Sequence, residues 1–244
     1  MIKDIDVFIL CGGLGKRLRA ISRNNPKPMV EIGGKPFLDL ILNYMAGFGF
    51  RRFILGTGYK AGAIKEHYTR NKKTGLNILF SRERSPLDTG GAVKNARKKI
   101  RSRYFFVLNG DSYCKFNPLD FVKFHNKNKA VVSILLGQVS DGREYGIVEL
   151  DRSLCIKSFN EKRSKAKKCL VNVGVYIFDR QVFDLMPQRK RFSLERDFFP
   201  SLTGGKTFGY PKSSFFIDIG TPERYIKAKK HEDSIWNDRH YAKI

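Results

Sequence analysis

Residues 5–18 read Ile5-Asp6-Val7-Phe8-Ile9-Leu10-Cys11-Gly12-Gly13-Leu14-Gly15-Lys16-Arg17-Leu18, a mostly apolar run that ends in glycines and two cations. The run from 5 to 10 is short enough to be one buried strand. Glycines directly after a strand let backbone N–H groups approach a ligand, and such groups form a concavity that binds anions. Pro26 and Pro28 stiffen the backbone on both sides of Lys27. The stretch therefore predicts a phosphate site with fixed positive charge.

Two common phosphate loops do not match this stretch. A Walker loop requires Ser or Thr after its Lys, but Lys16 is followed by Arg17. A dinucleotide loop requires a third glycine where Leu18 stands. What remains is G-G-x-G-x-R-L with a downstream P-K-P. An ordinary strand-to-helix turn with surface cations is the alternative interpretation.

Length and composition favour one large α/β domain. At 244 residues, we expect residues 1–230 to form a single domain and residues 231–244 to be a C-terminal tail of unassigned role. No apolar run approaches a membrane span, and no signal-peptide pattern is present. The four cysteines are far apart and show no C-x-x-C spacing. These features predict a reduced, cytoplasmic protein without membrane insertion.

The formal net charge is +24, with 47 Lys and Arg against 23 Asp and Glu. Such a balance suits nucleic acid, an anionic membrane surface or a small anionic substrate, and solvated Lys-rich faces are the plain alternative. No zinc-finger spacing, RNP-like aromatic motif or heptad array indicates nucleic acid. A basic nucleic-acid-binding protein on a degenerate enzyme fold remains the rival class, and it would bind oligonucleotides with a steep salt dependence.

Strands and helices alternate in the first half of the chain, which predicts a parallel sheet with helices on both faces. We expect strands at 5–10, 52–56, 76–80 and 104–108, a helix at 36–47 that starts at Pro36, a helix at 61–69, and a helix capped by Thr89 that runs to about Lys99. The alternation then breaks. We expect a helix at 121–128, strands at 130–136, 146–150, 156–162 and 170–178, short helices at 179–186 and 193–202 with Ser193 as a cap, a strand at 215–220, and a last helix capped by Thr221 with Pro222 at its first position.

Two aspartates follow or end apolar strands. Asp111 comes just after strand 104–108, and Asp218 lies between Ile217 and Ile219. A carboxylate in such a place is costly unless it is paired or bound to a cation. Carboxylate oxygens are the ligands that Mg²⁺ prefers beside phosphate oxygens and water. The alternative for each residue alone is a turn-capping Asp.

Other residues add weaker signals. Lys162 could bind a second phosphate and Glu161 could accept sugar hydroxyls, although a solvated charge pair fits equally well. The four histidines show no metal spacing, and no nucleophile motif is present. The residues therefore predict a reaction by direct displacement.

Taken as an ordered set, the motifs resemble those of the sugar nucleotidyltransferases along nearly the whole chain. This family joins a sugar 1-phosphate to a nucleoside triphosphate. The matching segments are the glycine loop with Arg17, then 26–28, 33–36, 89–92, 108–111, 145–146, 160–162, 172–174 and 218–223. Within the family, the segment Phe192-Ser193-Leu194-Glu195-Arg196-Asp197 and the compact length are most similar to the D-glycero-α-D-manno-heptose 1-phosphate guanylyltransferases.

The resemblance implies a Rossmann-like (GT-A-like), mostly parallel central sheet flanked by helices, with a small antiparallel sugar-binding part. It also implies roles for single residues. Gly12, Gly13, Gly15 and Arg17 would hold the triphosphate, Lys27 would contact the phosphates during displacement, Leu10, Thr89 and Gly90 would lie by the base, Asp111 and Asp218 would bind Mg²⁺, and Tyr145, Gly146, Glu161, Lys162 and Asn172 would hold the sugar 1-phosphate.

The implied partners are GTP and D-glycero-α-D-manno-heptose 1-phosphate, with a GDP-sugar for surface polysaccharide synthesis as product. Mannose or glucose 1-phosphate, and UTP, dTTP or CTP, are alternatives within the same reaction. The resemblance implies no nucleic acid partner and leaves a homodimer open. A glycosyltransferase of related fold is a second rival, but such enzymes commonly carry a D-x-D motif, which neither 109–111 nor 218–220 provides.

Two positions depart from the family pattern. Lys16 stands where a small hydroxyl residue is usual, and Asp88 stands where glycine is frequent. Lys16 adds charge beside the expected triphosphate site. Asp88 could accept from guanine N1–H and N2–H₂, or it could cap the helix that begins near Thr89. Both departures bear on the choice of nucleotide rather than on the type of reaction.

Overall fold

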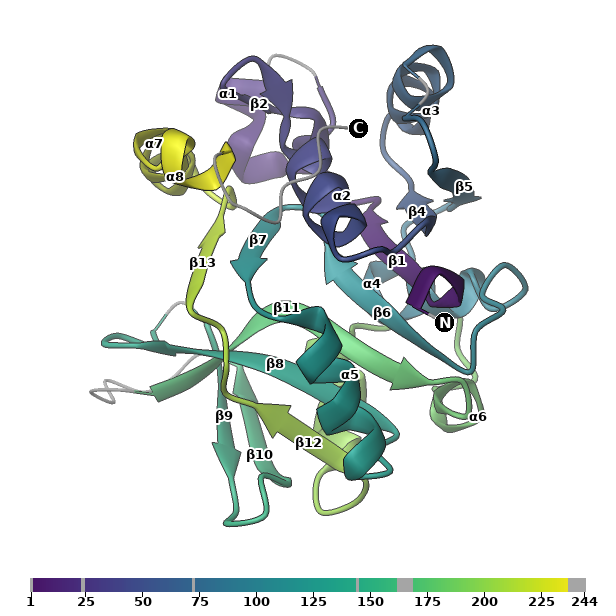
Figure 1. Cartoon of the computed structure of the whole chain (residues 1–244), viewed down its shortest axis with the longest axis vertical. Coiled ribbons are helices and arrows are strands. Elements are labelled where there is room, and N and C mark those ends of the chain that lie inside the picture. Colours follow the sequence, from purple (N-terminus) through teal and green to yellow (C-terminus); the bar gives the residue numbers. More distant parts are fainter. Residues whose placement is uncertain (1, 23–24, 72, 144, 162–168, 237–244) are drawn as a thin grey trace.

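The computed structural model describes residues 2–22, 25–71, 73–143, 145–161 and 169–236, and nine strands of this described part form one sheet (Figure 1). Its parallel centre has the order β6-β1-β4-β5. These strands are β1 (Asp6–Cys11), β4 (Arg52–Thr57), β5 (Asn77–Arg82) and β6 (Tyr104–Asn109). Strand β1 therefore lies inside the sheet, between β4 and β6, and carries the glycine loop at its carboxyl end.

An antiparallel part continues the sheet beyond β6. It consists of β8 (Val132–Val139), β9 (Gly146–Leu150), β10 (Ile156–Glu161) and β11 (Cys169–Asp179), with β12 (Thr207–Tyr210) parallel to β8. The long strand β11 pairs with β6, β8 and β9, so it joins the parallel and antiparallel parts. The expected α/β fold with a parallel centre and a small antiparallel part is thus confirmed.

Helices cover both faces of the sheet, as expected. On one face pack α2 (Phe37–Gly47), α3 (Ala61–Arg70) and α5 (Pro118–Lys127), and on the other pack α4 (Asp88–Asn95), α6 (Val182–Leu185) and the turns of 194–202. Figure 1 shows α2 and α5 in front of the sheet and α4 behind it. The alternation of β1 explains the two cores, because Val7 and Ile9 face one core and Phe8 faces the other.

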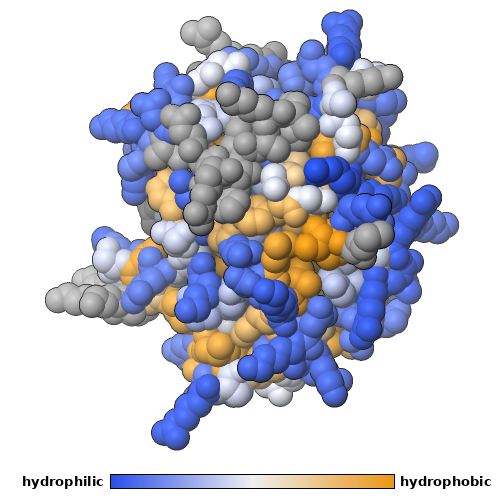
Figure 2. Space-filling view, viewed as in Figure 1, coloured by the Kyte–Doolittle hydropathy of each residue, from blue (hydrophilic) through white to orange (hydrophobic). Residues whose placement is uncertain are grey.

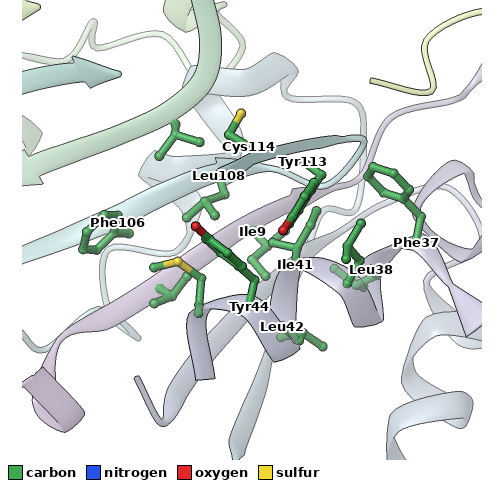
Figure 3. Close-up of a cluster of buried hydrophobic side chains, with 14 of the residues drawn as sticks. Ile9, Phe37, Leu38, Ile41, Leu42, Tyr44, Phe106, Leu108, Tyr113 and Cys114 are labelled. Atoms are coloured by element: carbon green, nitrogen blue, oxygen red, sulfur yellow. The ribbon is translucent and has the colours of Figure 1, made fainter. Parts of the chain in front are cut away.

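The core between α2 and the sheet anchors the chain that follows β6 (Figure 3). Tyr44 of α2 packs edge-on against Tyr113, with ring centroids 5.3 Å apart. The Tyr44 hydroxyl donates to the carbonyl of Phe116 at 2.7 Å and accepts from the Phe116 N–H at 3.0 Å. Tyr113 belongs to β7 (Ser112–Lys115), a strand that begins directly after Asp111. Buried hydrogen bonds thus hold the chain at the far end of β7, the strand that follows this aspartate.

Two short ladders were not expected from the sequence. Strand β7 pairs antiparallel with β13 (Phe215–Asp218), and Ser112 lies opposite Asp218. The second ladder is a hairpin of β2 (Glu31–Ile32) and β3 (Lys35–Pro36) around the turn at 33–34. The strand expected at 215–220 corresponds to β13, but β7, β2 and β3 are too short to show a period of two in the sequence, so only the tertiary pairing reveals them.

Three expected helix starts need correction. Pro36 ends β3 and precedes the helix, because its N-terminal neighbours pair in the hairpin, so α2 begins at Phe37. Thr89 does not cap α4, which begins at Asp88 and ends at Asn95, because the Thr89 hydroxyl bonds elsewhere. Helix α5 begins at Pro118 because the Asn117 side chain accepts from the N–H groups of residues 119 and 120.

Two expected caps are confirmed. Ser193 accepts from the N–H groups of Glu195 and Arg196, but the segment after it is a π-helical turn, Leu194–Phe198, followed by a 3-10 turn, Phe199–Leu202. Thr221 accepts from the Arg224 N–H and begins α7 (Pro222–Lys230), with Pro222 at the first helical position. The short helix α1 (Arg19–Ser22) follows the glycine loop.

The segment after α7 packs on the hairpin β2–β3. It forms α8 (Glu232–Trp236), in which Ile235 is fully buried. Lys35 Nζ of β3 lies 5.1 Å from the centre of the Trp236 ring. The last eight residues, 237–244, lie outside the described residues, and a separate role for 231–244 stays a prediction.

Hydrophilic side chains cover most of the face in Figure 2 and surround a smaller hydrophobic area. Among the described residues, the exposed large hydrophobic side chains are Leu14, Leu185 and Ile226. No helix in the described ranges has the length and apolar character needed to cross a membrane.

His125 makes the stability of this fold depend on pH. Its ring is buried, and Nδ1 lies 2.9 Å from Ser133 Oγ. Burial lowers the pKa of His125 from 6.5 to about 4. The unfolded chain therefore binds the proton more readily, so the contribution of His125 is complete above pH 6.5 and is lost as pH falls toward 4. Over this window the loss is about 3 kcal/mol.

We therefore expect wild type to lose about 3 kcal/mol more unfolding free energy between pH 7 and pH 4 than His125→Gln, whose side chain stays neutral. Urea unfolding at a series of pH values measures this difference. Parallel pH profiles for the two proteins would contradict the assignment.

Candidate functional site

Two neighbouring cavities open at the carboxyl ends of β1 and β6, the edge of the sheet where ligands bind in open α/β folds. The larger cavity has a volume of about 600 Å³ and lies between the glycine loop and residues 83–89. The smaller has about 360 Å³ and lies between Asp111, the start of β9 and residues 216–224. Both are lined by Lys27, Asn109 and Asp111, so they meet at these three side chains.

The structure divides the sequence-predicted site residues between the cavities. The larger cavity is lined by Leu10, Gly12, Gly13, Asp88 and Thr89, and the smaller by Arg17, Tyr145, Gly146, Asn172 and Asp218. Gly15 and Gly90 line neither cavity. The Glu161 backbone ends β10 opposite Gly146. The Glu161 side chain and the whole of Lys162 lie outside the described part of the chain.

The glycine loop folds against the stem of Lys27. Gly15 has a φ of +57°, and a Cβ there would lie 3.2 Å from Lys27 Cβ. Glycine adopts this left-handed backbone without strain. Lys27 begins a 3-10 turn, Lys27–Met29, which Pro26 precedes in an extended conformation. The Lys27 side chain is only 12% exposed, and its ammonium forms an ion pair with Asp111. The loop and the prolines therefore hold this cation in one place.

Asp111 and Asp218 are brought together by the β7–β13 ladder. The Ile219 N–H donates to the backbone carbonyl of Asp111 at 3.0 Å. Asp218 accepts from Arg224 Nη1 at 2.9 and 3.0 Å. Burial acts to raise the pKa of Asp111, but the charge and hydrogen bond of Lys27 outweigh it and hold this pKa below its usual value. Each carboxylate therefore already faces a cation, Lys27 for Asp111 and Arg224 for Asp218.

Asn109 is a functional candidate that the sequence analysis quoted only as part of a motif. Its Oδ1 is buried where the cavities meet and has no hydrogen-bond partner among the described residues. Gly174, with a φ of +78°, packs against its amide, and a Cβ at that glycine would collide with Asn109. A buried acceptor without a partner costs free energy unless a ligand or water supplies a donor. Across the described ranges, no three or more His, Cys, Asp or Glu side chains gather as a metal cluster.

Asp88 stands on the wall of the larger cavity in a strained conformation. Its φ is +57°, a region that a non-glycine residue rarely adopts. Arg191 Nε and Nη2 donate to the two carboxylate oxygens at 3.0 and 3.4 Å, and Arg196 lies 3.9 Å away. The hydrogen bond from Arg191 and the charge of Asp88 raise the pKa of Arg191. Asp88 starts the helix without a side-chain cap, so capping is not its role. Contact with guanine stays a prediction.

Several charged residues that line the cavities were not predicted as site residues from the sequence. Glu83, Arg84, Arg191 and Arg196 line the larger cavity, and Arg143, Glu195 and Arg224 line the smaller. Glu83 packs against the glycine loop, because a Cβ at Gly12 would overlap its carboxylate. Burial raises the pKa of Glu83. The motif around Glu195 was the one signal that pointed to any of these residues.

The two predicted nucleotide-site glycines Gly13 and Gly90 should differ sharply in stability tests. A Cβ at Gly90 would overlap the Phe192 ring, and the Gly90 N–H donates to the Phe192 carbonyl at 2.9 Å. We expect Gly90→Ala to lower the unfolding free energy by about 1–3 kcal/mol through overpacking. No atom lies within 4 Å of a Cβ at Gly13. Gly13→Ala is the matched control and should change stability by less than about 0.5 kcal/mol. Equal urea midpoints for the two variants would refute this account of Gly90.

Comparisons with known proteins agree along nearly the whole chain. The family model described as Nucleotidyl transferase matches residues 6–234. A D-glycero-alpha-D-manno-heptose 1-phosphate guanylyltransferase of Campylobacter jejuni is 36% identical over 221 residues, which cover 91% of this chain and 97% of that protein. A mannose-1-phosphate guanylyltransferase of Mycobacterium tuberculosis is 35% identical over 227 residues, 92% of this chain. The match covers 63% of that protein, so the chain spans less than two thirds of its length.

Among solved structures, HddC from Yersinia pseudotuberculosis is 37% identical with a TM-score of 0.83, and the match covers 93% of this chain and 98% of that chain. A second structure of HddC, described as complexed with GMP-PN, has a TM-score of 0.82.

Proposed function

The chain belongs to the nucleotidyl transferase family, and we propose that it joins GTP to a manno-configured sugar 1-phosphate, giving a GDP-sugar and pyrophosphate. The observation that carries this proposal is the meeting of the two cavities at Lys27, Asn109 and Asp111. Two anionic substrates that react with each other need adjacent pockets, and charged side chains where the pockets meet must hold the reacting groups close together. This arrangement offers such a boundary at the edge of the sheet.

We assign the nucleotide to the larger cavity and the sugar 1-phosphate to the smaller. The larger volume and the glycine-loop wall suit a nucleoside triphosphate. The smaller cavity has the amide of Asn172, the ring of Tyr145 and the guanidinium of Arg17 in its walls, which suit a polar, phosphorylated sugar. HddC, a solved structure similar to this chain, is described with GMP-PN, which supports a guanine nucleotide.

The reaction that fits this arrangement is one direct displacement. An oxygen of the sugar phosphate attacks the α-phosphorus of GTP, a new P–O bond forms, and the bond from the α-phosphorus to the bridging oxygen breaks. The electron pair leaves with pyrophosphate. A phosphate dianion is already a nucleophile, so no side chain has to remove a proton. Positioning and electrostatic stabilisation then supply most of the catalysis.

Cations at the boundary must overcome the repulsion between the two substrates. Two unit charges 4 Å apart repel by about 4 kcal/mol at an effective dielectric of 20. Lys27 is fixed at the junction, and Arg17 lines the smaller cavity beside it. Lys162 follows the Glu161 end of β10 and would add a third cation. We propose that these residues offset the repulsion between the two substrates, and that Lys27 at the junction stabilises the charge that develops on the departing pyrophosphate.

The residues at the junction fit Mg²⁺ as the cofactor. Asp218 ends β13 and Asp111 directly precedes its partner strand β7, so both offer carboxylate oxygens here, and Asn109 Oδ1 is a buried oxygen without a partner among the described residues. Hard oxygen ligands of this kind, with phosphate and water, are what Mg²⁺ takes. When bound, the ion would neutralise phosphate charge and help to orient the triphosphate. Asp111 and Asp218 would hold it.

D-glycero-α-D-manno-heptose 1-phosphate is the first candidate for the sugar. Relatives with that name match this chain over 97% of their own length, whereas the mannose-1-phosphate guanylyltransferase from Mycobacterium tuberculosis is matched over 63%. Mannose 1-phosphate shares the manno configuration and is the second candidate. The product would serve surface polysaccharide synthesis.

Release of pyrophosphate tests the proposal directly. GTP, ATP, CTP, UTP and dTTP are each paired with manno-configured heptose, mannose and glucose 1-phosphates, with Mg²⁺ and then with a chelator. We expect release only with GTP and a manno-configured sugar, and its loss on chelation. No release from folded protein with any pair would reject the enzyme and favour the nucleic-acid-binding rival.

Removing the carboxylate of Asp111 or of Asp218 should suppress turnover without unfolding the protein. We expect Asp111→Asn and Asp218→Asn each to lower kcat by about 10²- to 10³-fold, because the Mg²⁺ that these carboxylates would hold at the phosphates binds more weakly. Asp120→Asn is the matched control, since Asp120 lines neither cavity and forms its ion pair with Lys123 of the same helix. Steady-state pyrophosphate release measures the effect. Near-normal, Mg²⁺-dependent kcat in both junction variants would exclude the proposed metal ligands.

A further inference from the structure

The segment Phe192–Asp197 lies between the two cavities, although the proposed function gives it no role. Ser193 lines the larger cavity, and Glu195, two residues later, lines the smaller. Glu195 belongs to the π-helical turn Leu194–Phe198. Such turns are rare and occur frequently at functional sites. The contacts of Glu195 therefore need a separate account.

One carboxylate oxygen of Glu195, Oε2, accepts two hydrogen bonds, both from residues that line the larger cavity. Thr89 Oγ1 donates to Oε2 at 2.7 Å, and Ser193 Oγ donates to it at 2.8 Å. Thr89 Oγ1 itself accepts from the Leu194 N–H at 2.8 Å, and Ser193 Oγ accepts from backbone N–H groups of the same turn. Each hydroxyl has a single proton, so both protons point at Glu195. The carboxylate must therefore be the acceptor, held in one orientation.

The other oxygen, Oε1, is only partly occupied. Tyr176 OH lies 3.3 Å from it, which is long for a hydrogen bond between a hydroxyl and a carboxylate. The same hydroxyl accepts from Asn172 Nδ2 at 2.9 Å, and Asn172 Oδ1 accepts from the Gly174 N–H at 2.9 Å. A carboxylate oxygen can accept two hydrogen bonds. Oε1 therefore keeps acceptor capacity beside a cavity that Asn172 also lines.

We propose that Glu195 Oε1 accepts a hydrogen bond from a hydroxyl of the sugar 1-phosphate, and that Thr89 and Tyr176 are positioning residues for this carboxylate. The inference rests on the proposed assignment of the smaller cavity to the sugar. A sugar that lacks this hydroxyl would leave the half-buried carboxylate oxygen without its hydrogen-bond donor, so the site would bind that sugar more weakly. Thr89 lies on the wall of the larger cavity and binds Glu195. Substitution of Thr89 should therefore alter the affinity for the sugar 1-phosphate in the smaller cavity.

Glu195→Gln removes this acceptor while keeping the shape of the side chain. Its amide NH₂ must face either the hydroxyl protons of Thr89 and Ser193 or the sugar and Tyr176. We expect KM for the sugar 1-phosphate to rise about 10- to 100-fold while KM for GTP changes less than about 3-fold. Asp197→Asn is the matched control in the same turn. Asp197 accepts from the Ser193 N–H and pairs with Arg189, and it lines neither cavity.

Deoxy substrates test the hydrogen bond itself. Pyrophosphate release is measured with α-D-mannose 1-phosphate, D-glycero-α-D-manno-heptose 1-phosphate and the 2-, 3- and 4-deoxy analogues of whichever wild type turns over. In wild type, loss of the hydroxyl that Glu195 binds should lower kcat/KM about 10- to 100-fold. In Glu195→Gln the same analogue should show no further loss. Thr89→Val should raise the sugar KM, and Thr89→Ser should restore it.

The outcomes separate this inference from the proposed function. Absence of activity in wild type with every pair rejects both. An active wild type in which Glu195→Gln leaves the sugar KM unchanged, or raises both KM values equally, rejects the role of Glu195 alone. If Glu195→Gln does not fold, the Thr89 pair decides. A sugar KM that is the same in Thr89→Val and Thr89→Ser overturns the inference, and a selective rise that Ser reverses supports it.

Discussion

The ion pair between Lys27 and Asp111 is the contact on which the rest of the site depends. It joins the prolines after the glycine loop to the end of β6, and its two side chains belong to both cavities. Gly15 packs on the stem of Lys27, and the Tyr44 hydroxyl anchors the strand that follows Asp111. Both partners of the ion pair are therefore held by the fold, so charge at the junction is fixed before any substrate arrives.

The site is not simply a positive patch on a protein with net charge +24. Its carboxylates are each matched by donors or cations: Asp111 by Lys27, Asp218 by Arg224, Asp88 by Arg191 and Glu195 by three hydroxyl groups. Such pairing offsets the cost of placing carboxylates at a partly buried edge. A transferase for two anionic substrates needs this balance, because cations attract the phosphates while oriented acceptors recognise hydroxyls or a metal ion.

Much of the fold could be predicted from the sequence because its signals are local. The apolar run before Gly12, the alternation through β6 and the caps at Ser193 and Thr221 all act within a few residues. Strand β7 could not be predicted, since four residues show no periodicity until β13 pairs with them. Thr89 was expected to cap a helix, yet its hydroxyl bonds residues 105 and 106 positions away. The motif around Glu195 could likewise be recognised in the sequence, but its contacts with Thr89 and Tyr176 could not be predicted, because these residues are distant in the chain.

A crystal structure of the chain with Mg²⁺ and GDP-D-glycero-α-D-manno-heptose would test the central claim most directly. The account predicts that the diphosphate lies at Lys27, Asp111 and Asp218, with guanosine in the larger cavity and the heptose in the smaller. Density for the heptose in the larger cavity, or for the diphosphate away from Lys27 and Asp111, would contradict it.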